Sequence, residues 1–224
     1  MVFIMFQKLF STENPVWRAM DRMGDLMILN FLFIFFSIPI FTIGASLTAL
    51  YTVSFKLLDE TEGNIVKNYF KAFKNNFKQA TAIWIIVVLA GLFLAYDAYL
   101  AYVSTSIISK ILMGVIILVA IIYAMWVSWL FPVQSKFDNP VKVNMKNAAL
   151  MMVIHMFPTT LLITVLNVVP LLILWFYTTT FFAFLPFVVF LMFSFIVYNN
   201  CKQLKLAFAD YIPENDLPED PYKE

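Results

Sequence analysis

The sequence predicts an all-α integral membrane protein, a polytopic bundle of about five transmembrane helices. Hydrophobic residues make up 62% of the chain and charged residues 13%, whereas soluble domains have roughly 25% charged residues. Apolar stretches recur along the chain, and each is long enough to cross a hydrocarbon core, which takes about 20 helical residues. The expected spans are residues 25–55, 80–103, 110–132, 148–176 and 178–199.

Residues 1–24 are expected to form an interfacial segment ahead of the first span. Asn14 suits a helix N-cap, and Pro15 suits the first helical turn, where a missing N–H is harmless. Arg18 and Arg22 lie one turn apart and alternate with acidic residues at helical contact spacing. The first residues lack the charged start, apolar core and cleavage site of a signal peptide, so we expect none to be removed.

The first span is expected to be broken at Pro39 and Gly44, because proline removes a helical hydrogen bond and glycine loosens the backbone. A single broken span is favoured over a helical hairpin, since each arm of a hairpin would have only about a dozen residues, too few to cross. Asp25 and Asn30, at the entrance of the span, are expected to hold it to neighbouring helices.

Residues 64–79 are predicted to form an amphipathic helix on the cytoplasmic membrane surface. Apolar residues recur there at steps of three and four, and four lysines recur on another face. Such a helix suits the surface of an anionic leaflet, and the alternative is a docking surface for a partner. The lysines are Lys67, Lys71, Lys74 and Lys78.

A short sequence motif, which we call the internal echo, occurs twice in the chain. Lys74-Asn-Asn-Phe-Lys-Gln-Ala80 precedes the second span, and Lys142-Val-Asn-Met-Lys-Asn-Ala148 precedes the fourth. We interpret the two copies as the starts of two helical-hairpin repeats, although lysine and asparagine are common enough in these loops for coincidence. The residues proposed to contact a partner or lipid are Asp25, Asn30, Pro39, Gly44, Lys67, Lys71, Lys74, Asn76, Lys78, Lys142, Asn144, Lys146 and Asn147.

The orientation is predicted from the lysines and arginines, which are retained on the cytoplasmic side. With five crossings, the C-terminus is cytoplasmic and the N-terminus is outside. This topology places 11 lysines and arginines on the cytoplasmic side and 4 outside. The hairpin alternative places the N-terminus inside, with 14 lysines and arginines on the cytoplasmic side and 1 outside. Residues 206–224, rich in acidic residues and proline, are expected to be a disordered tail.

The chain offers little for catalysis. It has one histidine, one cysteine and five glycines, so it lacks the usual metal-ligand spacings, nucleophile elbows and phosphate loops. We expect no enzyme activity and no cofactor. The net charge of +1 and the absence of a basic tract argue against nucleic acid as a partner.

Three polar residues inside the spans are the remaining candidates, because burying such groups in a membrane is costly. Asp97 either pairs with Lys110 across the outer loop or is solvated at the interface. Asn167 is expected to bond between helices. His155, with Pro158 three residues later, marks either a kink or a proton-linked site, and the kink is favoured.

Several segments resemble the YesL-like membrane proteins, a bacterial family carried as a domain of unknown function. The resemblance covers about residues 13–205. The resembling segments are Asp25-Leu-x-x-x-Asn30, Ile38-Pro-Ile-Phe-Thr-Ile-Gly44, Ala49-Leu-Tyr51, Phe70-x-x-Phe73-Lys-x-Asn-Phe-Lys-Gln-Ala80, Lys146-Asn-Ala148 and His155-x-x-Pro158.

The resemblance implies a multi-pass protein of the cell membrane of Gram-positive bacteria, often encoded beside carbohydrate importers of the ATP-binding cassette (ABC) type. It implies no catalytic residues. The chain lacks the Glu-Ala-Ala…Gly loop of importer permeases, so we expect an accessory subunit of such an importer that aids assembly, stability or gating. Its partners would be the lipid bilayer and the permease and ATPase subunits. The alternatives are an independent small transporter or channel, and a lipid-interacting membrane protein.

Overall fold

The computed structural model describes residues 15–176 and 185–211, and every regular element in these ranges is a helix. The predicted all-α fold class is confirmed. The expected N-cap at Asn14, the start of the expected fifth span at residues 178–184 and the tail from residue 212 lie outside the described residues. The elements are α2 (Pro15–Phe36), η1 (Ile40–Thr42), α3 (Ile43–Leu58), α4 (Ile65–Val103), α5 (Ile107–Lys136), α6 (Val141–Ile154), η2 (Met156–Thr160), α7 (Leu161–Phe176), η3 (Val188–Met192) and α9 (Phe193–Ala209).

Within the described ranges, five helical stretches are long and apolar enough to cross a membrane. This agrees with the five predicted spans, and the chain is a multi-pass membrane protein. The boundaries differ from the expected ones because helices in the structure run past the apolar runs. The five stretches are Ile40–Leu58, Ile65–Val103, Ile107–Lys136, Met156–Ile173 and Leu185–Ala209.

The expected break at Pro39 is present, but the expectation of a single broken span is wrong. Near the turn, the Ser46 hydroxyl donates a hydrogen bond to the Phe33 carbonyl. At the other end of the same two helices, the Arg22 guanidinium bonds to the Leu57 carbonyl. Helices α2 and α3 are therefore antiparallel, as in the hairpin alternative. Helix α2 has 22 residues, about 33 Å of helix, but the part of this hairpin that is long and apolar enough to cross a membrane is Ile40–Leu58.

Helix α4 begins as predicted at residue 64. The Asn64 side chain accepts a hydrogen bond from the Lys67 backbone N–H at 2.9 Å, and Gly63 ahead of it has a φ of +53°, which glycine adopts without strain. The predicted surface helix and the following span form one helix of 39 residues. Phe77, Lys78 and Gln79 lie inside it, so the expected boundary at residue 80 is not a helix end.

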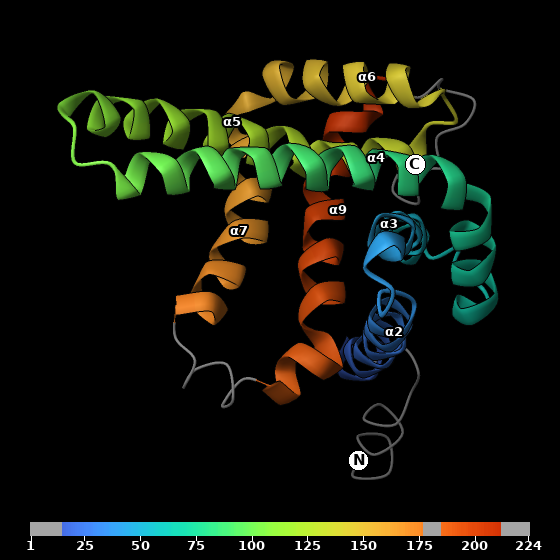
Figure 1. Cartoon of the computed structure of the whole chain (residues 1–224). Coiled ribbons are helices and arrows are strands. Elements are labelled where there is room, and N and C mark those ends of the chain that lie inside the picture. Colours follow the sequence, from blue (N-terminus) through green and yellow to red (C-terminus); the bar gives the residue numbers. More distant parts are fainter. Residues whose placement is uncertain (1–14, 177–184, 212–224) are drawn as a thin grey trace, which may run out of the picture.

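Helices α4 and α5 form a long hairpin that extends beyond the other helices, and α7 and α9 run steeply across it (Figure 1). The two expected hairpins are thus not parallel to each other. The far half of the α4–α5 hairpin exposes large apolar side chains, with Phe93 67% and Ile108 76% exposed. Such surface requires lipid or another protein to cover it.

The expected kink at His155 and Pro158 is present. Helix α6 ends at Ile154, and a π-helical turn, η2, joins it to α7. The Trp129 indole N–H donates to the Thr160 hydroxyl at 2.8 Å, and that hydroxyl donates to the Met152 carbonyl at 3.1 Å. These hydrogen bonds connect the two sides of the kink. They also give partners to polar groups that the interruption of the helix would otherwise leave without a hydrogen bond. The expected fourth span, residues 148–176, is therefore divided between two helices.

The helical domain extends past the expected boundary at residue 205. Helix α9 continues to Ala209, and Phe208 is fully buried. Its ring centroid lies 5.9 Å from that of Phe55, 6.0 Å from Trp129 and 5.4 Å from Phe137. Residues 206–209 therefore belong to α9, and Ala207 and Phe208 belong to the core rather than to the tail.

Candidate functional site

The two copies of the internal echo meet at one side chain, Gln134 of α5. Its amide nitrogen donates to the Asn76 side-chain oxygen at 3.2 Å and to that of Gln79 at 3.1 Å. Its oxygen accepts a hydrogen bond from the Asn144 amide at 2.7 Å. Asn76 and Asn144 hold the same place in the two copies. We call these four residues the amide cluster, and it joins α4, α5 and α6.

The two copies also share a pattern of burial. Ala80 and Ala148, their last residues, are both fully buried. Their lysines, Lys74, Lys78, Lys142 and Lys146, are all exposed. Both copies therefore form helix with the same face turned inward, which agrees with the interpretation of a repeat.

Burial decides which residues of the echo can meet a partner. Asn144 is fully buried and its side-chain oxygen has no hydrogen-bond partner within the described ranges. Its proposed role in binding a partner or lipid is therefore wrong, because the side chain is enclosed by α5 and α6. Asn76 and Asn147 are half-buried, and the lysines remain accessible.

A second polar group, the polar chain, links four helices: α3, α9, α7 and α5. The Asn200 amide donates to the Tyr51 hydroxyl at 3.2 Å and to the Asn167 side-chain oxygen at 2.8 Å. The Asn167 amide in turn donates to the Ser128 hydroxyl at 3.4 Å. Asn167 thus bonds between helices, as expected of an amide inside an apolar protein. Asn200 is fully buried, and its oxygen has no partner in the described part.

The polar chain borders a central cavity of about 370 Å³, within the usual range of small-ligand sites. Tyr51, Ser128 and Asn167 line part of it, and mostly apolar side chains from α2, α3, α4, α5, α7, η3 and α9 line the rest. No carboxylate, imidazole, amine or thiol from the described residues lines the cavity. The cavity offers hydroxyl and amide groups that can orient a ligand, without a pair for acid–base chemistry.

The residues that carry the first-span motif serve internal packing. The Asn30 amide donates to the Val188 carbonyl at 3.0 Å and the Val189 carbonyl at 2.7 Å, and its oxygen accepts the Ser194 backbone N–H at 3.1 Å. Asn30 thus holds α2 to the π-helical turn before α9, as expected of an inter-helix contact. It is fully buried, so its proposed contact with a partner is wrong.

Gly44 is likewise buried, between α3 and α4, and its proposed contact with a partner is wrong for the same reason. Small residues at this position let two helix backbones approach closely. Pro39 is exposed at the tip of the α2–α3 hairpin, and Asp25 is half-buried.

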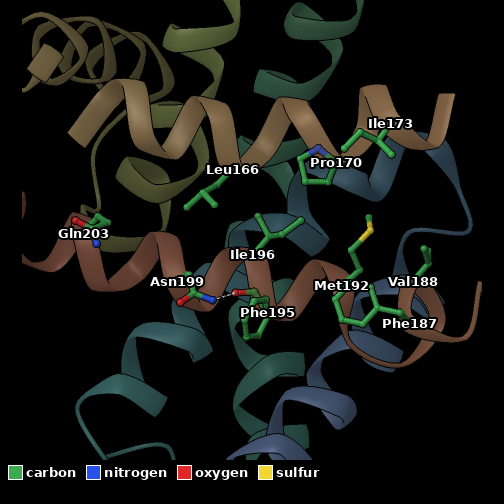
Figure 2. A pocket seen from close by; sticks show the side chains of 10 residues that line it. All are labelled: Leu166, Pro170, Ile173, Phe187, Val188, Met192, Phe195, Ile196, Asn199 and Gln203. Carbon is green, nitrogen blue, oxygen red and sulfur yellow. Dashed lines mark hydrogen bonds between the residues drawn. The ribbon is translucent and has the colours of Figure 1, made fainter. Parts of the chain in front are cut away.

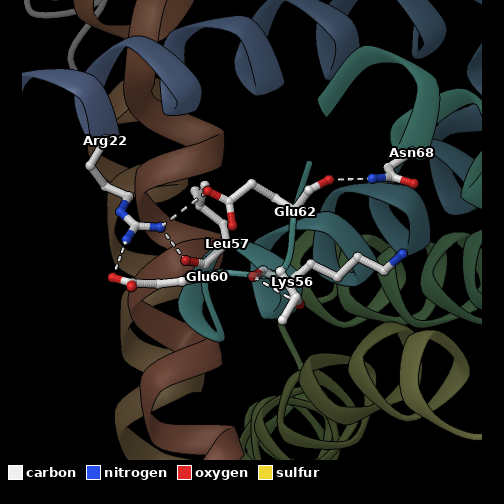
Figure 3. A network of polar contacts seen from close by, with 7 residues as sticks. Arg22, Lys56, Leu57, Glu60, Glu62 and Asn68 are labelled. Atoms are coloured by element: carbon white, nitrogen blue, oxygen red, sulfur yellow. Dashed lines mark hydrogen bonds and ion pairs between the residues drawn. The ribbon is translucent and has the colours of Figure 1, made fainter. Parts of the chain in front are cut away.

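Arg22 ties the beginning of α2 to the loop after α3 (Figure 3). Besides the Leu57 carbonyl, its guanidinium contacts the Glu60 carboxylate at 3.1 Å and the Glu62 carboxylate at 3.9 Å. A cation at the carbonyl end of a helix is favourable. Partial burial, and next the negative charge of Glu62, raise the pKa of Asp25 one turn further along α2.

The carbonyl ends of α3, α5 and α9 lie together at one end of the molecule, which we call the basic end. The Lys205 ammonium lies 2.6 Å from the Asp59 carboxylate, and the Lys136 ammonium lies 5.3 Å from the centroid of the Phe55 ring. The lysines of the amphipathic segment, Lys67, Lys71, Lys74 and Lys78, are exposed. The basic end is therefore available to anionic groups.

The three intramembrane polar candidates are not brought together. Within the described ranges no ion pair joins Asp97 to Lys110, and neither is bonded to His155 or Asn167. The His155 ring stacks on Trp129 with centroids 5.8 Å apart, and its Nε2 has no hydrogen bond there. Asn167 belongs to the polar chain. A transport path lined by these three residues is not supported.

Sequence reasoning missed Gln134 of the amide cluster and Asn200 and Tyr51 of the polar chain. Gln134 and Asn200 lie next to other polar residues at the ends of apolar runs, so no clear signal in the sequence indicated that they are buried. Among the described residues, no group of three or more His, Cys, Asp or Glu is placed to hold a metal ion.

Comparison with known proteins gives two matches. The family model described as "Protein of unknown function, DUF624" matches residues 26–98, which hold the first-span motif and the first copy of the echo. The YesL protein of Bacillus subtilis (strain 168) is 28% identical over 136 residues, covering 59% of this chain and 64% of that protein. The match thus spans less than two thirds of the relative's length. No solved structure matches the chain. These matches agree with the motif residues in their order, and they support the resemblance of this chain to the YesL-like membrane proteins.

Proposed function

We propose that this protein is an accessory membrane subunit that associates with a carbohydrate importer of the ABC type and aids its assembly, stability or gating. The observation that carries the proposal is the α4–α5 hairpin, whose far half extends beyond the other helices (Figure 1). Leu89 on α4 and Leu118 on α5 are 62% and 58% exposed. A paired apolar hairpin of this kind offers an accessible surface to the helices of a partner protein.

The polar groups support a structural role. The amide cluster and the polar chain are used in bonds between helices of the chain itself. The partner class, a carbohydrate importer, is what the family resemblance implies. The basic end, with its exposed lysines, is suited to contact with the cytoplasmic parts of such an importer.

The contacts of Arg22 favour an orientation with both arms of the α2–α3 hairpin ending on the cytoplasmic side. Arg22 lies against Leu57, Glu60 and Glu62, in the loop that the lysine distribution places inside. We therefore favour a cytoplasmic beginning of α2 over the external N-terminus expected from five simple crossings. The C-terminal end of α9 is proposed to be cytoplasmic as well.

The test is co-purification from native membranes in a mild detergent. Wild-type protein should recover permease and ATPase subunits of an importer. The double variant Leu89→Ala/Phe93→Ala, one turn apart on the exposed face of α4, should recover at least about tenfold less, since each truncation removes apolar surface that the partner would cover. Leu161→Ala/Val165→Ala, with the same spacing on α7, is the matched control. Recovery of no transporter subunit by the wild type would refute the proposal.

A second candidate function, an independent small transporter, is favoured by the central cavity beside Tyr51, Ser128 and Asn167. Flux of small solutes into liposomes that contain only this protein distinguishes it from the first. Flux that Asn167→Leu abolishes would favour the transporter, whereas tight liposomes would leave the accessory role.

A further inference from the structure

A groove of about 570 Å³ lies between α7 and α9 (Figure 2). Pro170 and Ile173 of α7 form one wall, and Met192 and Ile196 form the opposite wall. Beside the groove, the Asn200 amide donates a hydrogen bond of 2.8 Å to the Asn167 side-chain oxygen and so joins the two helices. The groove is therefore a defined feature of the helix pair, and its size falls within the range of ligand sites.

The groove has a polarity gradient along its length. Asn199 and Gln203, one turn apart on α9, are the polar side chains that line it within the described part, and they lie toward one end (Figure 2). Asn199 donates to the Phe195 carbonyl at 2.8 Å, whereas no side-chain hydrogen bond of Gln203 is found among the described residues. Phe187 and Val188 lie at the opposite end. One end is thus amide-rich and the rest is apolar.

The residue before Gln203 on α9 is a cation, Lys202, which is exposed and does not itself line the groove. Its ammonium lies 4.8 Å from the centroid of the Tyr198 ring. Within the described ranges, Lys202 takes part in no ion pair, whereas Lys205 is paired with Asp59. Helix α9 itself carries no acidic residue. Basic groups between membrane helices on the cytoplasmic side commonly bind anionic headgroups.

We propose that this groove binds one anionic glycerophospholipid. An acyl chain lies along the apolar part, between Pro170 and Ile196, and the phosphate is held at the end formed by Gln203 and Lys202. The free Gln203 amide donates to the phosphate or ester oxygens, and Lys202 supplies the opposite charge. The apolar length of the groove suits an acyl chain and its amide end suits a phosphate or ester, so we commit to a lipid as the occupant rather than to the transmembrane helix of a partner. This inference does not depend on the proposed function.

The test is native mass spectrometry of the full chain in detergent, titrated with phosphatidylglycerol and, separately, with phosphatidylcholine. Wild-type protein should bind one phosphatidylglycerol more tightly than phosphatidylcholine. Ile173→Trp fills the groove and should weaken both by about tenfold, because a chain segment of a few methylenes loses its place. Leu172→Trp is the matched control, since Leu172 and Ile173 are similarly exposed, 48% and 45%, and Leu172 does not line the groove.

Lys202→Gln gives a second, surface readout if Ile173→Trp fails to fold by circular dichroism and gel filtration. It should remove the preference for phosphatidylglycerol while leaving phosphatidylcholine binding unchanged. The proposal is overturned if the wild type binds phosphatidylglycerol no more tightly than phosphatidylcholine, and Lys202→Gln does the same. Loss of protein partners with Ile173→Trp while lipid binding stays intact also overturns it, because the groove would then be a site for a partner helix.

Discussion

Gly44 of α3 lies directly against the backbone carbonyl of Ala80 in α4. A Cβ atom at residue 44 would lie 2.6 Å from that oxygen and 2.5 Å from the Cβ of Trp84, closer than side chains approach one another in folded proteins. The glycine of the first-span motif and the last alanine of the first echo copy are thus two sides of one helix contact. Neither neighbour can move alone, since one is backbone and the other is the root of a side chain.

We expect Gly44→Ala to destabilise the protein by about 1–3 kcal/mol, the usual cost of overpacking. Thermal unfolding in detergent, followed by circular dichroism, measures the change. Gly114→Ala is the control, because a Cβ there meets nothing within 4 Å. Equal unfolding temperatures for the two variants would contradict the close contact.

Gln134 should contribute more to the stability of the fold than a single side chain usually does, because it bonds to the other three residues of the amide cluster. Gln134→Ala leaves Asn144 buried without its main partner and is expected to cost about 1–3 kcal/mol. Asn75→Ala, at an exposed neighbour of Asn76, should change stability little. In a double-mutant cycle, Gln134→Ala and Asn144→Ala should be non-additive because they remove one shared bond. Additive losses would show that the two amides do not interact.

Local features were predictable from the sequence because neighbouring residues produce them. The apolar runs predicted five membrane-length helices, Asn64 predicted a helix start, and Pro158 predicted a kink. Each of these depends on the length of a run or on the chemistry of one or two residues.

Contacts between distant segments were not predictable in the same way. Asn30 bonds to residues 158 and 159 positions further along the chain, and no local pattern specifies that partner. The fold-back of α2 on α3 depends on Arg22 meeting Leu57 and two glutamates. The lengths of the apolar runs contain no information about such a contact. An argument from length alone therefore favoured a single broken span. Gln134 was missed because an isolated glutamine near a helix end resembles a solvated residue.

Asn30 is expected to be essential for the contact between α2 and the turn before α9. Asn30→Ala leaves two carbonyls and one N–H without their partner, and should cost about 1–3 kcal/mol for the buried groups. Asn199→Ala removes a bond to a carbonyl of its own helix and serves as the control in the same unfolding measurement. A loss for Asn30→Ala no larger than for Asn199→Ala would contradict the assigned role.

Asp25 should make stability depend on pH. Burial and Glu62 raise its pKa in the folded protein above the ordinary value of 3.8, so the folded state binds more protons than the unfolded state above that pH. Stability contributed by this group therefore falls as pH rises through the folded pKa. We expect Asp25→Asn to be more stable than wild type at neutral pH, with the difference shrinking near pH 4. Unfolding temperatures of both proteins from pH 4 to 7.5 check this, and parallel pH curves would contradict it.

The orientation proposed from Arg22 is tested by labelling single cysteines in intact cells with a membrane-impermeant maleimide. The background is Cys201→Ala, which removes the native buried thiol. Thr61→Cys and Arg18→Cys should both react only after the membrane is permeabilised, because the Arg22 contacts hold the start of α2 beside the loop after α3. Ser106→Cys, in the exposed turn between α4 and α5, should react in intact cells. Reaction of Arg18→Cys without permeabilisation, with Thr61→Cys still protected, would place the two arms on opposite sides and restore the single broken span.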